Sequence, residues 1–362
     1  METSIADFRR LVEQTTDPAE YPHATGVERN VLIYDRTLRR AARDELARAL
    51  RDGPGIVVIK GAFATGVVDR ATAVFAAMIE EQKAAGVVGG DHFAKPGEND
   101  RVWGALDKFA VRDPQAFAAY YDNDVLALVS DSWLGPGYQV TSQVNVVNPG
   151  GRAQVAHRDY HLGFMSRGQA ERYPAHTHLL TPALTLQGAV AHVDMPVESG
   201  PTLYLPHSQK YAPGYLAFHE PEFTAYFEGA YVQLPLEKGD AAFFNPALFH
   251  GAGTNRTTNV RRMANLLQIS SAFGRAMETV DRLAMCRALY PVLRSFPGTA
   301  DNVVAACAEG YAFPTNLDRD QPLGGLAPQT QAELMRQALA EQWDVSQFEK
   351  ALLEQHERRL AG

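Results

Sequence analysis

The feature of this sequence that most limits its fold is a change of pattern near Tyr138. From there to about Ser270, short apolar runs are separated by Pro, Gly and Asn residues. Runs of this kind are typical of the short strands of a β-sandwich or jelly roll. The strands that we expect cover residues 138–147, 184–193, 202–205, 230–236, 241–244 and 263–270.

The regions on either side predict helices. Before Tyr138 we expect a mainly helical N-terminal part with one strand, Ile56–Ile59, because β-branched residues follow one another there. After Phe273 the sequence again favours helices. The helices that we expect cover residues 38–50, 68–83 and 114–134, with a surface helix pair within 330–360.

These patterns predict a single domain over residues 1–362, in the class of mainly β folds with helical additions. Residues 138–272 are expected to form a double-stranded β-helix (jelly roll) core that carries the functional site. Helices from residues 1–137 are expected to pack on one sheet of this core, and residues 273–362 to form a helical C-terminal extension.

Composition excludes several classes of function. The chain has 34 Lys and Arg residues against 42 Asp and Glu residues, a formal net charge of −8, whereas a nucleic-acid-binding surface needs clustered positive charge. Two cysteines, Cys286 and Cys307, are too few for a disulfide framework or an iron–sulfur cluster. The sequence shows neither an apolar signal stretch nor the run of ~18 apolar residues that a membrane helix needs. We therefore expect a soluble, cytoplasmic protein with a small-molecule substrate and with no nucleic-acid or membrane partner.

Three residues point to metal chemistry: His157, Asp159 and His250. His157 and Asp159 are two positions apart, so in an extended chain their side chains lie on the same side. His250 follows another strand-like run well downstream. Two imidazoles and one carboxylate form the facial triad of non-haem Fe(II) oxygenases, so we predict these residues to be the metal ligands and catalytic residues. An isolated His-x-Asp pair is more often a hydrogen-bonded surface pair, and the prediction therefore depends on the residues that come after His250.

The stretch after His250 ends in Arg261 and Arg262, at the start of an expected strand. A guanidinium forms two parallel hydrogen bonds with a carboxylate, and such an arginine could hold the distal carboxylate of a 2-oxo diacid that chelates the metal. Adjacent residues of a strand face opposite sides, so only one of the two arginines can point inward. We predict on spacing that Arg261 is the inward residue and binds the co-substrate, and that Arg262 points outward.

Three segments resemble the phytanoyl-CoA dioxygenase superfamily of Fe(II)/2-oxoglutarate oxygenases. Residues 237–257 contain a Gly-Asp turn and a Phe-rich strand that ends at His250, and the family places an arginine eleven residues after this His, where Arg261 stands. His157 and Asp159 match the family's proximal pair. Residues 198–209 resemble a further segment, in which His207 and Gln209 replace the usual Gly and His. The resemblance covers roughly residues 50–272.

The resemblance implies Fe(II), with 2-oxoglutarate and O₂ as co-substrates, and hydroxylation of a small or medium-sized metabolite with release of succinate and CO₂. Related halogenases carry a small residue in place of the carboxylate, so Asp159 favours hydroxylation. Asn145 and Thr254 are implied as further contacts of 2-oxoglutarate. For Asn145, hydrogen bonding at a strand edge is an equally good interpretation.

Four more residues are predicted to contact the substrate: Tyr160 and His161 at the mouth of the site, and Gln187 and His192 in an expected strand. Each has a plain alternative, such as packing for His161, backbone pairing for Gln187 and a core position for His192. For the whole protein, the alternative to a dioxygenase is a cupin-like metal-binding protein or isomerase that does not use 2-oxoglutarate.

Overall fold

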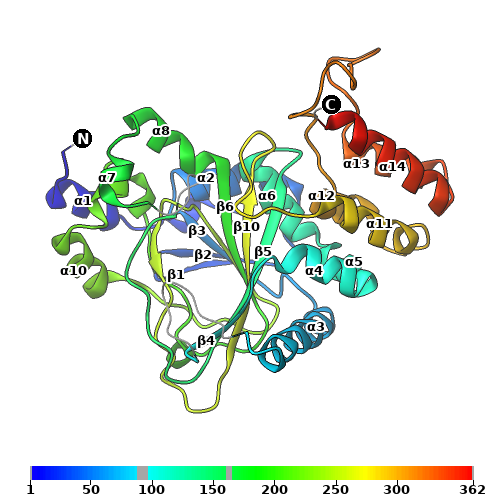
Figure 1. Ribbon diagram of the computed structural model, residues 1–362. Helices are drawn as coiled ribbons and strands as arrows, with labels where there is room; N and C mark the ends of the chain where they lie inside the picture. Colours follow the sequence, from blue (N-terminus) through cyan, green and yellow to red (C-terminus); the bar gives the residue numbers. More distant parts are fainter. Residues whose placement is uncertain (1, 88–96, 160–164, 361–362) are drawn as a thin grey trace.

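The computed structural model describes residues 2–87, 97–159 and 165–360. Its centre is an eight-stranded sheet in the order β1-β2-β3-β8-β6-β10-β5-β4, accompanied by the two-stranded ribbon β7–β9 (Figure 1). The strands of the large sheet are β1 Gly26–Glu28, β2 Val31–Asp35, β3 Ile56–Lys60, β4 Asn99–Val102, β5 Gln139–Val147, β6 Thr185–Ala191, β8 Ala241–Phe244 and β10 Arg262–Ser270. The ribbon consists of β7 Leu203–Leu205 and β9 Phe249–Gly251.

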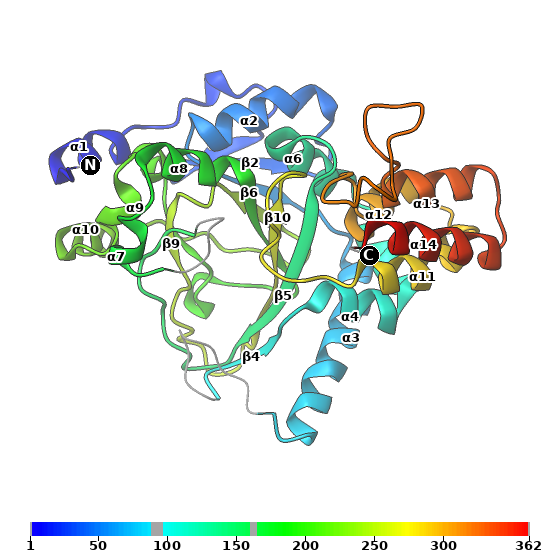
Figure 2. The same cartoon turned by 45° about the horizontal axis from the view of Figure 1, so that its top comes forward.

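The longer helices cover one face of the large sheet, and α13 and α14 lie outside α11 and α12 (Figures 1 and 2). This group comprises α2 Arg43–Arg51, α3 Thr65–Ala84, α4 Ala105–Arg112, α5 Pro114–Tyr121, α6 Asp124–Leu134, α11 Arg282–Leu293, α12 Ala300–Cys307, α13 Gln331–Ala340 and α14 Val345–Arg359. At the opposite end of the molecule lie α1 Ile5–Val12, α7 Arg167–Ala170, α8 Ala175–Leu180, α9 Gly214–Ala217 and α10 Pro221–Ala230. Short 3₁₀ helices span Pro18–Glu20, Arg40–Ala42, Thr181–Leu184, Val197–Ser199 and Ser208–Lys210. None of the helices in the described ranges is long and apolar enough to span a lipid bilayer.

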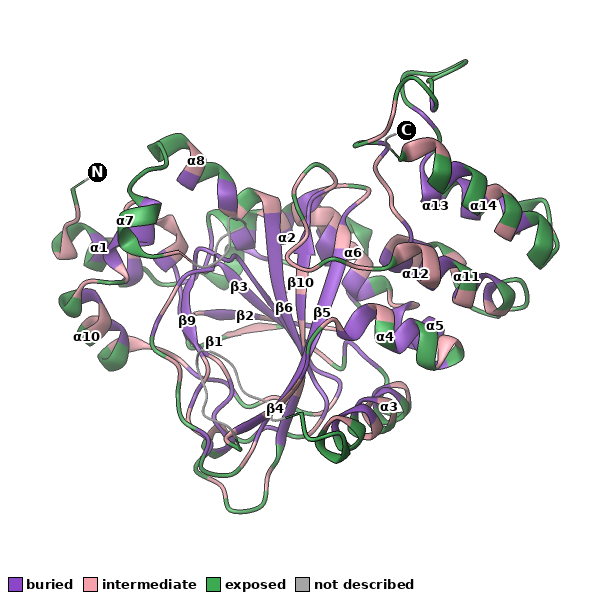
Figure 3. Cartoon of the chain, viewed as in Figure 1, coloured by how far each residue is buried: buried purple, intermediate pink, exposed green. Residues whose placement is uncertain are grey.

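The alternation of side chains along the strands gives the large sheet two different faces. Val144 of β5 and Leu267 of β10 point into the main hydrophobic core, which the sheet shares with the helices. Gln143 of β5 and Arg262 and Gln268 of β10 point to the other face and line a cavity. The strands are buried along most of their length, and exposed residues gather on the outward sides of the helices (Figure 3). The inner face of the sheet is therefore the place where polar residues can form a site.

The predicted jelly-roll core with helical additions is confirmed, although helices hold 43% and strands 16% of the described residues. The strand expected at 241–244 coincides with β8, and the expected C-terminal helix pair corresponds to α13 and α14. The helix expected over 114–134 is two helices, since Asp122 ends α5 and the Asn123 side chain caps α6.

Two predictions about strands are wrong. Residues 1–137 contribute four strands rather than one, because β1 and β2 form a hairpin through Arg29 and Asn30 at positive φ and polar β4 pairs at the edge of the sheet. Residues 230–236 do not form a strand, because α10 extends to Ala230 and the following chain makes only single bridges, such as that of Val232 with Tyr204.

The turn before β8 is fixed by the carboxylate of Asp240, which is 2% exposed. It forms an ion pair of 2.8 Å with Lys60 at the end of β3 and accepts the backbone N–H groups of Gly61 and Glu237 at 2.8 Å each. We expect Asp240→Ala to lower the free energy of unfolding by about 2 kcal/mol, since buried polar groups lose their partners. Urea denaturation followed by circular dichroism measures this change.

The exposed Asp194 is a suitable control, because its carboxylate accepts a single backbone N–H, that of Lys238, at 2.9 Å. We expect Asp194→Ala to change the free energy of unfolding by no more than ~0.5 kcal/mol. Equal losses for the two variants would contradict the role of Asp240.

Candidate metal centre

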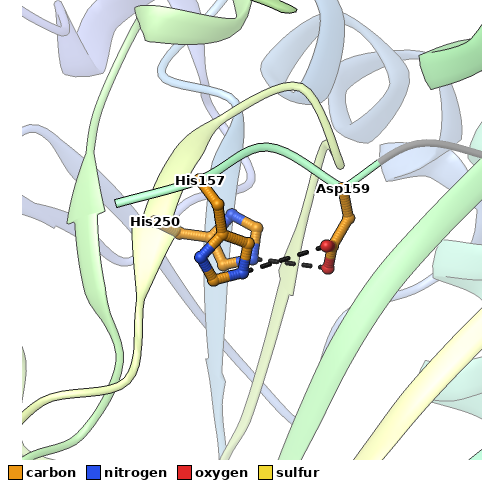
Figure 4. A group of neighbouring side chains, drawn as sticks. All are labelled: His157, Asp159 and His250. Atoms are coloured by element: carbon orange, nitrogen blue, oxygen red, sulfur yellow. Dashed lines mark ion pairs between the residues drawn. The ribbon is translucent and has the colours of Figure 1, made fainter. Parts of the chain in front are cut away.

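The structure brings the side chains of His157, Asp159 and His250 together (Figure 4). Their ligand atoms all lie within 4.8 Å of one another. His250 lies in β9, and His157 pairs with it through two backbone hydrogen bonds of 3.0 and 3.1 Å. Asp159 continues the extended segment and donates its backbone N–H to the carbonyl of Pro246 at 3.0 Å. Pairing with β9 thus holds residues 157 and 159 on the same side of the chain, facing His250.

Arg158, between the two, points the other way. Its guanidinium donates to the carbonyl oxygens of Ser208 and Tyr211 at 2.6 and 2.9 Å and lies over the ring of Phe249 at 5.1 Å. Arg158 is 5% exposed. The His-x-Asp segment is therefore anchored inside the protein and is not a surface pair.

Both imidazoles are oriented by nearby backbone carbonyls. Nδ1 of His157 donates to the carbonyl of Val155 at 2.8 Å, and Nδ1 of His250 to that of Leu248 at 2.9 Å. Because a carbonyl oxygen only accepts, the proton lies on Nδ1 and the lone pair on Nε2 of each neutral ring. The two Nε2 atoms face the Asp159 carboxylate, 3.8 Å from Oδ1 and 3.6 Å from Oδ2. The three donor groups are thus prepared to share one metal ion.

The carboxylate of Asp159 is kept ionised by its surroundings. Burial alone would raise its pKa, but the neighbouring imidazoles of His250 and His157, whenever they carry a second proton, and the hydrogen bond from Gln187 together lower the pKa below its usual value. Nε2 of Gln187 donates to Oδ2. Oδ1 of Asp159 has no hydrogen-bond partner within the part of the chain that the structure describes. A buried anion with an unpaired oxygen between two imidazoles is a good ligand for a divalent cation.

The triad lies in the wall of a cavity of about 320 Å³. Inward-facing residues of β5, β6 and β10 line one side of the cavity, and residues near β7 and β9 line the other. The polar residues of the lining include Gln143, Asn145, Gln187, Arg262, Gln268 and Glu278.

The structure corrects the choice between the two arginines. Arg261 is exposed and its guanidinium binds Asp100 at 2.8 Å and Asn148 at 3.2 Å, outside the cavity. Arg262 is 6% exposed and lines the cavity. The reason is the strand period: β10 begins at Arg262, which shares the inner face with Ala264 and every second residue after it. The inward arginine is Arg262, not Arg261.

Arg262 is a buried cation without an acidic partner. Nη1 donates to the carbonyl of Gly253 at 3.3 Å, and within residues 2–87, 97–159 and 165–360 no carboxylate forms an ion pair with the guanidinium. Burial lowers its pKa to about 10, so the group stays charged at neutral pH. A cation in this position is suited to an anionic ligand that enters the cavity.

Two of the other predicted site residues lie in the cavity wall. Asn145, on β5, accepts a hydrogen bond of 3.3 Å from Asn99 and faces the cavity. Gln187, on β6, contacts Asp159 as described above and is 5% exposed.

Two predicted residues lie elsewhere. The hydroxyl of Thr254 accepts the N–H of Ala153 at 3.0 Å, and Thr254 does not line the cavity of the triad. His192 follows β6 on the face that packs against the helices, where its ring nitrogens bind Thr72 at 2.8 Å and Tyr120 at 3.0 Å. Burial lowers the pKa of His192 to about 3, as for a neutral core histidine. The predicted roles of Thr254 and His192 are therefore wrong. Tyr160 and His161 lie outside the described residues.

Sequence reasoning missed Arg262, Gln143 and Glu278. The sequence of β10 contained enough information to place Arg262. The apolar residues Leu267 and Ile269 indicate that odd-numbered residues of this strand face the helices, so even-numbered residues such as Arg262 face the cavity. Gln143 follows the same rule on β5. Glu278 lies in the irregular segment after β10, where no periodic pattern marks it.

Comparisons with known proteins show to which family the chain is similar. The model of the family described as Phytanoyl-CoA dioxygenase (PhyH) matches residues 52–263, which include the triad and Arg262. Dioxygenase trt7 from Aspergillus terreus (strain NIH 2624 / FGSC A1156) is 31% identical over 143 residues, which span 40% of this chain and 43% of that protein.

Two solved structures are also similar to the chain. The non-haem α-ketoglutarate-dependent epimerase SnoN from nogalamycin biosynthesis has a TM-score of 0.44 and 20% identity, covering 65% of this chain and 82% of its own. The corresponding carbocyclase SnoK has a TM-score of 0.47 and 21% identity, covering 68% of this chain and 89% of its own.

The contact between Gln187 and Asp159 yields a prediction about metal binding. We expect Gln187→Leu to weaken Fe(II) or Mn(II) binding about tenfold, because hydrogen bonds to a ligand carboxylate orient it. Anaerobic isothermal titration calorimetry measures the affinity. The matched control is Gln268→Leu, since Gln268 lies directly opposite Gln187 in the strand register and lines the same cavity. Equal affinities of the two variants would show that the hydrogen bond does not matter.

Proposed function

The chain belongs to the phytanoyl-CoA dioxygenase family, and from this premise we propose that it is an Fe(II)- and 2-oxoglutarate-dependent dioxygenase that hydroxylates a small or medium-sized metabolite. The observation that carries the proposal is the combination of the His157–Asp159–His250 triad with the buried cation Arg262 in one cavity. The name of the relative Dioxygenase trt7 agrees with this class of activity.

The donor set fits Fe(II). Two neutral imidazoles and one carboxylate suit this ion, and three protein ligands leave coordination positions for small molecules. The backbone carbonyls of Val155 and Leu248 keep Nε2 of each histidine directed at the shared point. In this proposal His157, Asp159 and His250 are the metal ligands and catalytic residues.

Arg262 fits the distal carboxylate of 2-oxoglutarate. The cavity wall offers this carboxylate a permanently charged guanidinium that has no acidic neighbour in the described chain. Tyr204 lines the same cavity and lies close enough to Arg262 to raise the pKa of its guanidinium, which opposes the effect of burial. Asn145, two residues before the end of β5, is a second polar contact for the co-substrate in this proposal.

Bound together, Fe(II) and 2-oxoglutarate supply the oxidising chemistry, in which O₂ is consumed and 2-oxoglutarate is converted to succinate and CO₂. The protein's own residues do the rest. Arg262 orients the co-substrate, the triad fixes the metal, and apolar side chains such as Leu236, Leu266 and Phe244 limit the access of water to the site. Because Asp159 supplies the third protein ligand, we propose hydroxylation rather than halogenation.

The proposal predicts that substitution of Arg262, but not of the adjacent Arg261, raises the apparent KM for 2-oxoglutarate. We expect Arg262→Gln to raise the apparent KM for 2-oxoglutarate about 30-fold or more, because loss of one partner of a buried charge pair costs 2–5 kcal/mol. Arg261→Gln removes a guanidinium that binds Asp100 at the surface, and we expect it to leave this KM within about twofold. Initial rates of succinate formation at varied 2-oxoglutarate measure both values. If Arg261→Gln had the larger effect, the assignment of the co-substrate site would be refuted.

Metal and co-substrate binding can be tested without a known substrate. We expect anaerobic addition of Fe(II) and 2-oxoglutarate to produce a weak visible charge-transfer band, and Asp159→Ala to lose both the band and succinate formation. A cupin-like metal-binding protein or isomerase that does not use 2-oxoglutarate would bind the metal without developing the band. A band of full intensity in Asp159→Ala would contradict the ligand assignment.

A further inference from the structure

The cavity has a second polar region, away from Arg262. Gln143 on β5 lies opposite Leu266 of β10, four residues along the strand from Arg262. Glu278 lines the same region, and Gln143 is close enough to lower its pKa. The co-substrate end of the cavity is thus cationic, whereas this region contains a carboxylate together with the guanidinium of Arg101, which donates to Gln143.

One oxygen of Glu278 has no partner. Oε1 accepts the backbone N–H of Gly104 at 2.9 Å, but the buried Oε2 makes no hydrogen bond within the described part of the chain. Burial, followed by the charge of Asp107, raises the pKa of Glu278, while the bond from Gly104 opposes this shift. The guanidinium of Arg101 also lines the cavity, but it donates to Gln143 at 3.1 Å and lies 4.6 Å from the ring centre of Trp103. Arg101 is thus engaged by groups other than Glu278.

A second acceptor without a partner lies beside the metal ligands. Because Nε2 of Gln187 donates to the Asp159 carboxylate, which can only accept, the orientation of the amide is determined and Oε1 is its free end. This buried Oε1 has no hydrogen-bond partner in the described chain, and Gln187 lines the cavity. The wall therefore presents one neutral acceptor beside the metal ligands and one carboxylate oxygen in the Gln143–Glu278 region.

We propose that these two acceptors select the substrate: a small molecule whose protonated amine binds Glu278 and whose second N–H or O–H donor binds Oε1 of Gln187. This inference rests on the proposed function and specifies its substrate class. Buried acceptors without partners destabilise a protein, and a ligand that supplies donors offsets this cost. A cationic donor matches Glu278 better than a hydroxyl group, because it also neutralises a partly desolvated charge. An uncharged acyl chain would leave both acceptors unpaired.

A purely structural role for Glu278 must be separated from substrate binding. Gly104 precedes α4, so Oε1 of Glu278 acts as an acceptor at the N-terminal end of that helix. Glu278→Gln keeps an amide oxygen that can accept from Gly104 but removes the charge that would bind an amine. The variant therefore preserves the structural contact and changes the proposed specificity.

The experiment measures succinate formation at saturating Fe(II) and 2-oxoglutarate. The probes are amino acids, diamines and amino sugars, each compared with its N-acetyl derivative, which lacks the cation. We expect wild-type protein to be stimulated by at least one amine and by none of the acetylated probes. In Glu278→Gln we expect the apparent KM for that amine to rise about tenfold or more.

The matched control is Asp281→Asn. Asp281 is a nearby exposed carboxylate that caps α11 by accepting the N–H of Ala284 at 2.9 Å and does not line the cavity. We expect this variant to keep the wild-type KM for the amine and the wild-type melting temperature.

The outcomes distinguish the two proposals. Absence of both probe-independent succinate formation and the charge-transfer band would refute the dioxygenase function itself. If 2-oxoglutarate is consumed but no amine stimulates the protein, if acetylated probes act equally well, or if Glu278→Gln retains the wild-type KM, the dioxygenase function stands and the substrate class is wrong.

Discussion

The two-residue period of β5, β6 and β10 is the constraint on which the rest of the molecule depends. Successive side chains of a strand point to opposite faces, so each of these strands contributes to two environments. Val144, Val190 and Leu267 join the core beneath the helices, whereas Asn145, Gln187 and their inward neighbours form the cavity. A shift of register by one residue would exchange the two sets and bury polar groups among the helices. The hydrophobic core and the candidate site are therefore specified by the same alternation.

Local structure then decides which predictions from the sequence succeed. His157 and Asp159 are two residues apart in one extended segment, so their spacing predicted that both face the same side. His250 lies in the paired strand β9, far downstream, and was identified through the residues that follow it and the family resemblance. The inward arginine was misassigned because residues 252–261 form an irregular loop, and counting through a loop does not preserve the parity of the next strand. The apolar residues Leu267 and Ile269 of β10 show that odd-numbered residues of this strand face the helices, and this alternation would have selected Arg262 as the inward residue. The same rule assigns His192 to the helix-packed face.

Other features could not have been inferred from the sequence. Strand β4 is a short polar segment that is a strand only because it pairs with β5, and the position of Glu278 depends on an irregular segment that meets Gly104. Propensity is a weak guide to both, since tertiary contacts determine their conformation. The overall class was predictable because the apolar runs of the core are numerous and regular. The polar lining was less predictable, because a buried Gln or Glu in a cavity wall has the same local sequence signature as one at a surface.

The cavity keeps the guanidinium of Arg262 apart from the carboxylate of Glu278. Arg262 lies four residues along β10 from Leu266, the residue opposite Gln143, which corresponds to about 14 Å at the rise of a strand. Placed side by side, the guanidinium and the carboxylate would form a buried ion pair and neutralise each other. Ala264 lies between these two positions on the inner face, opposite Asn145, and no carboxylate of the described chain forms an ion pair with Arg262. The triad lies in the wall of the same cavity, and through Gln187 the ligand Asp159 is joined to a group that faces the interior. In the proposals made above, an anion and a cation bind in separate regions of the cavity that also holds the metal ligands.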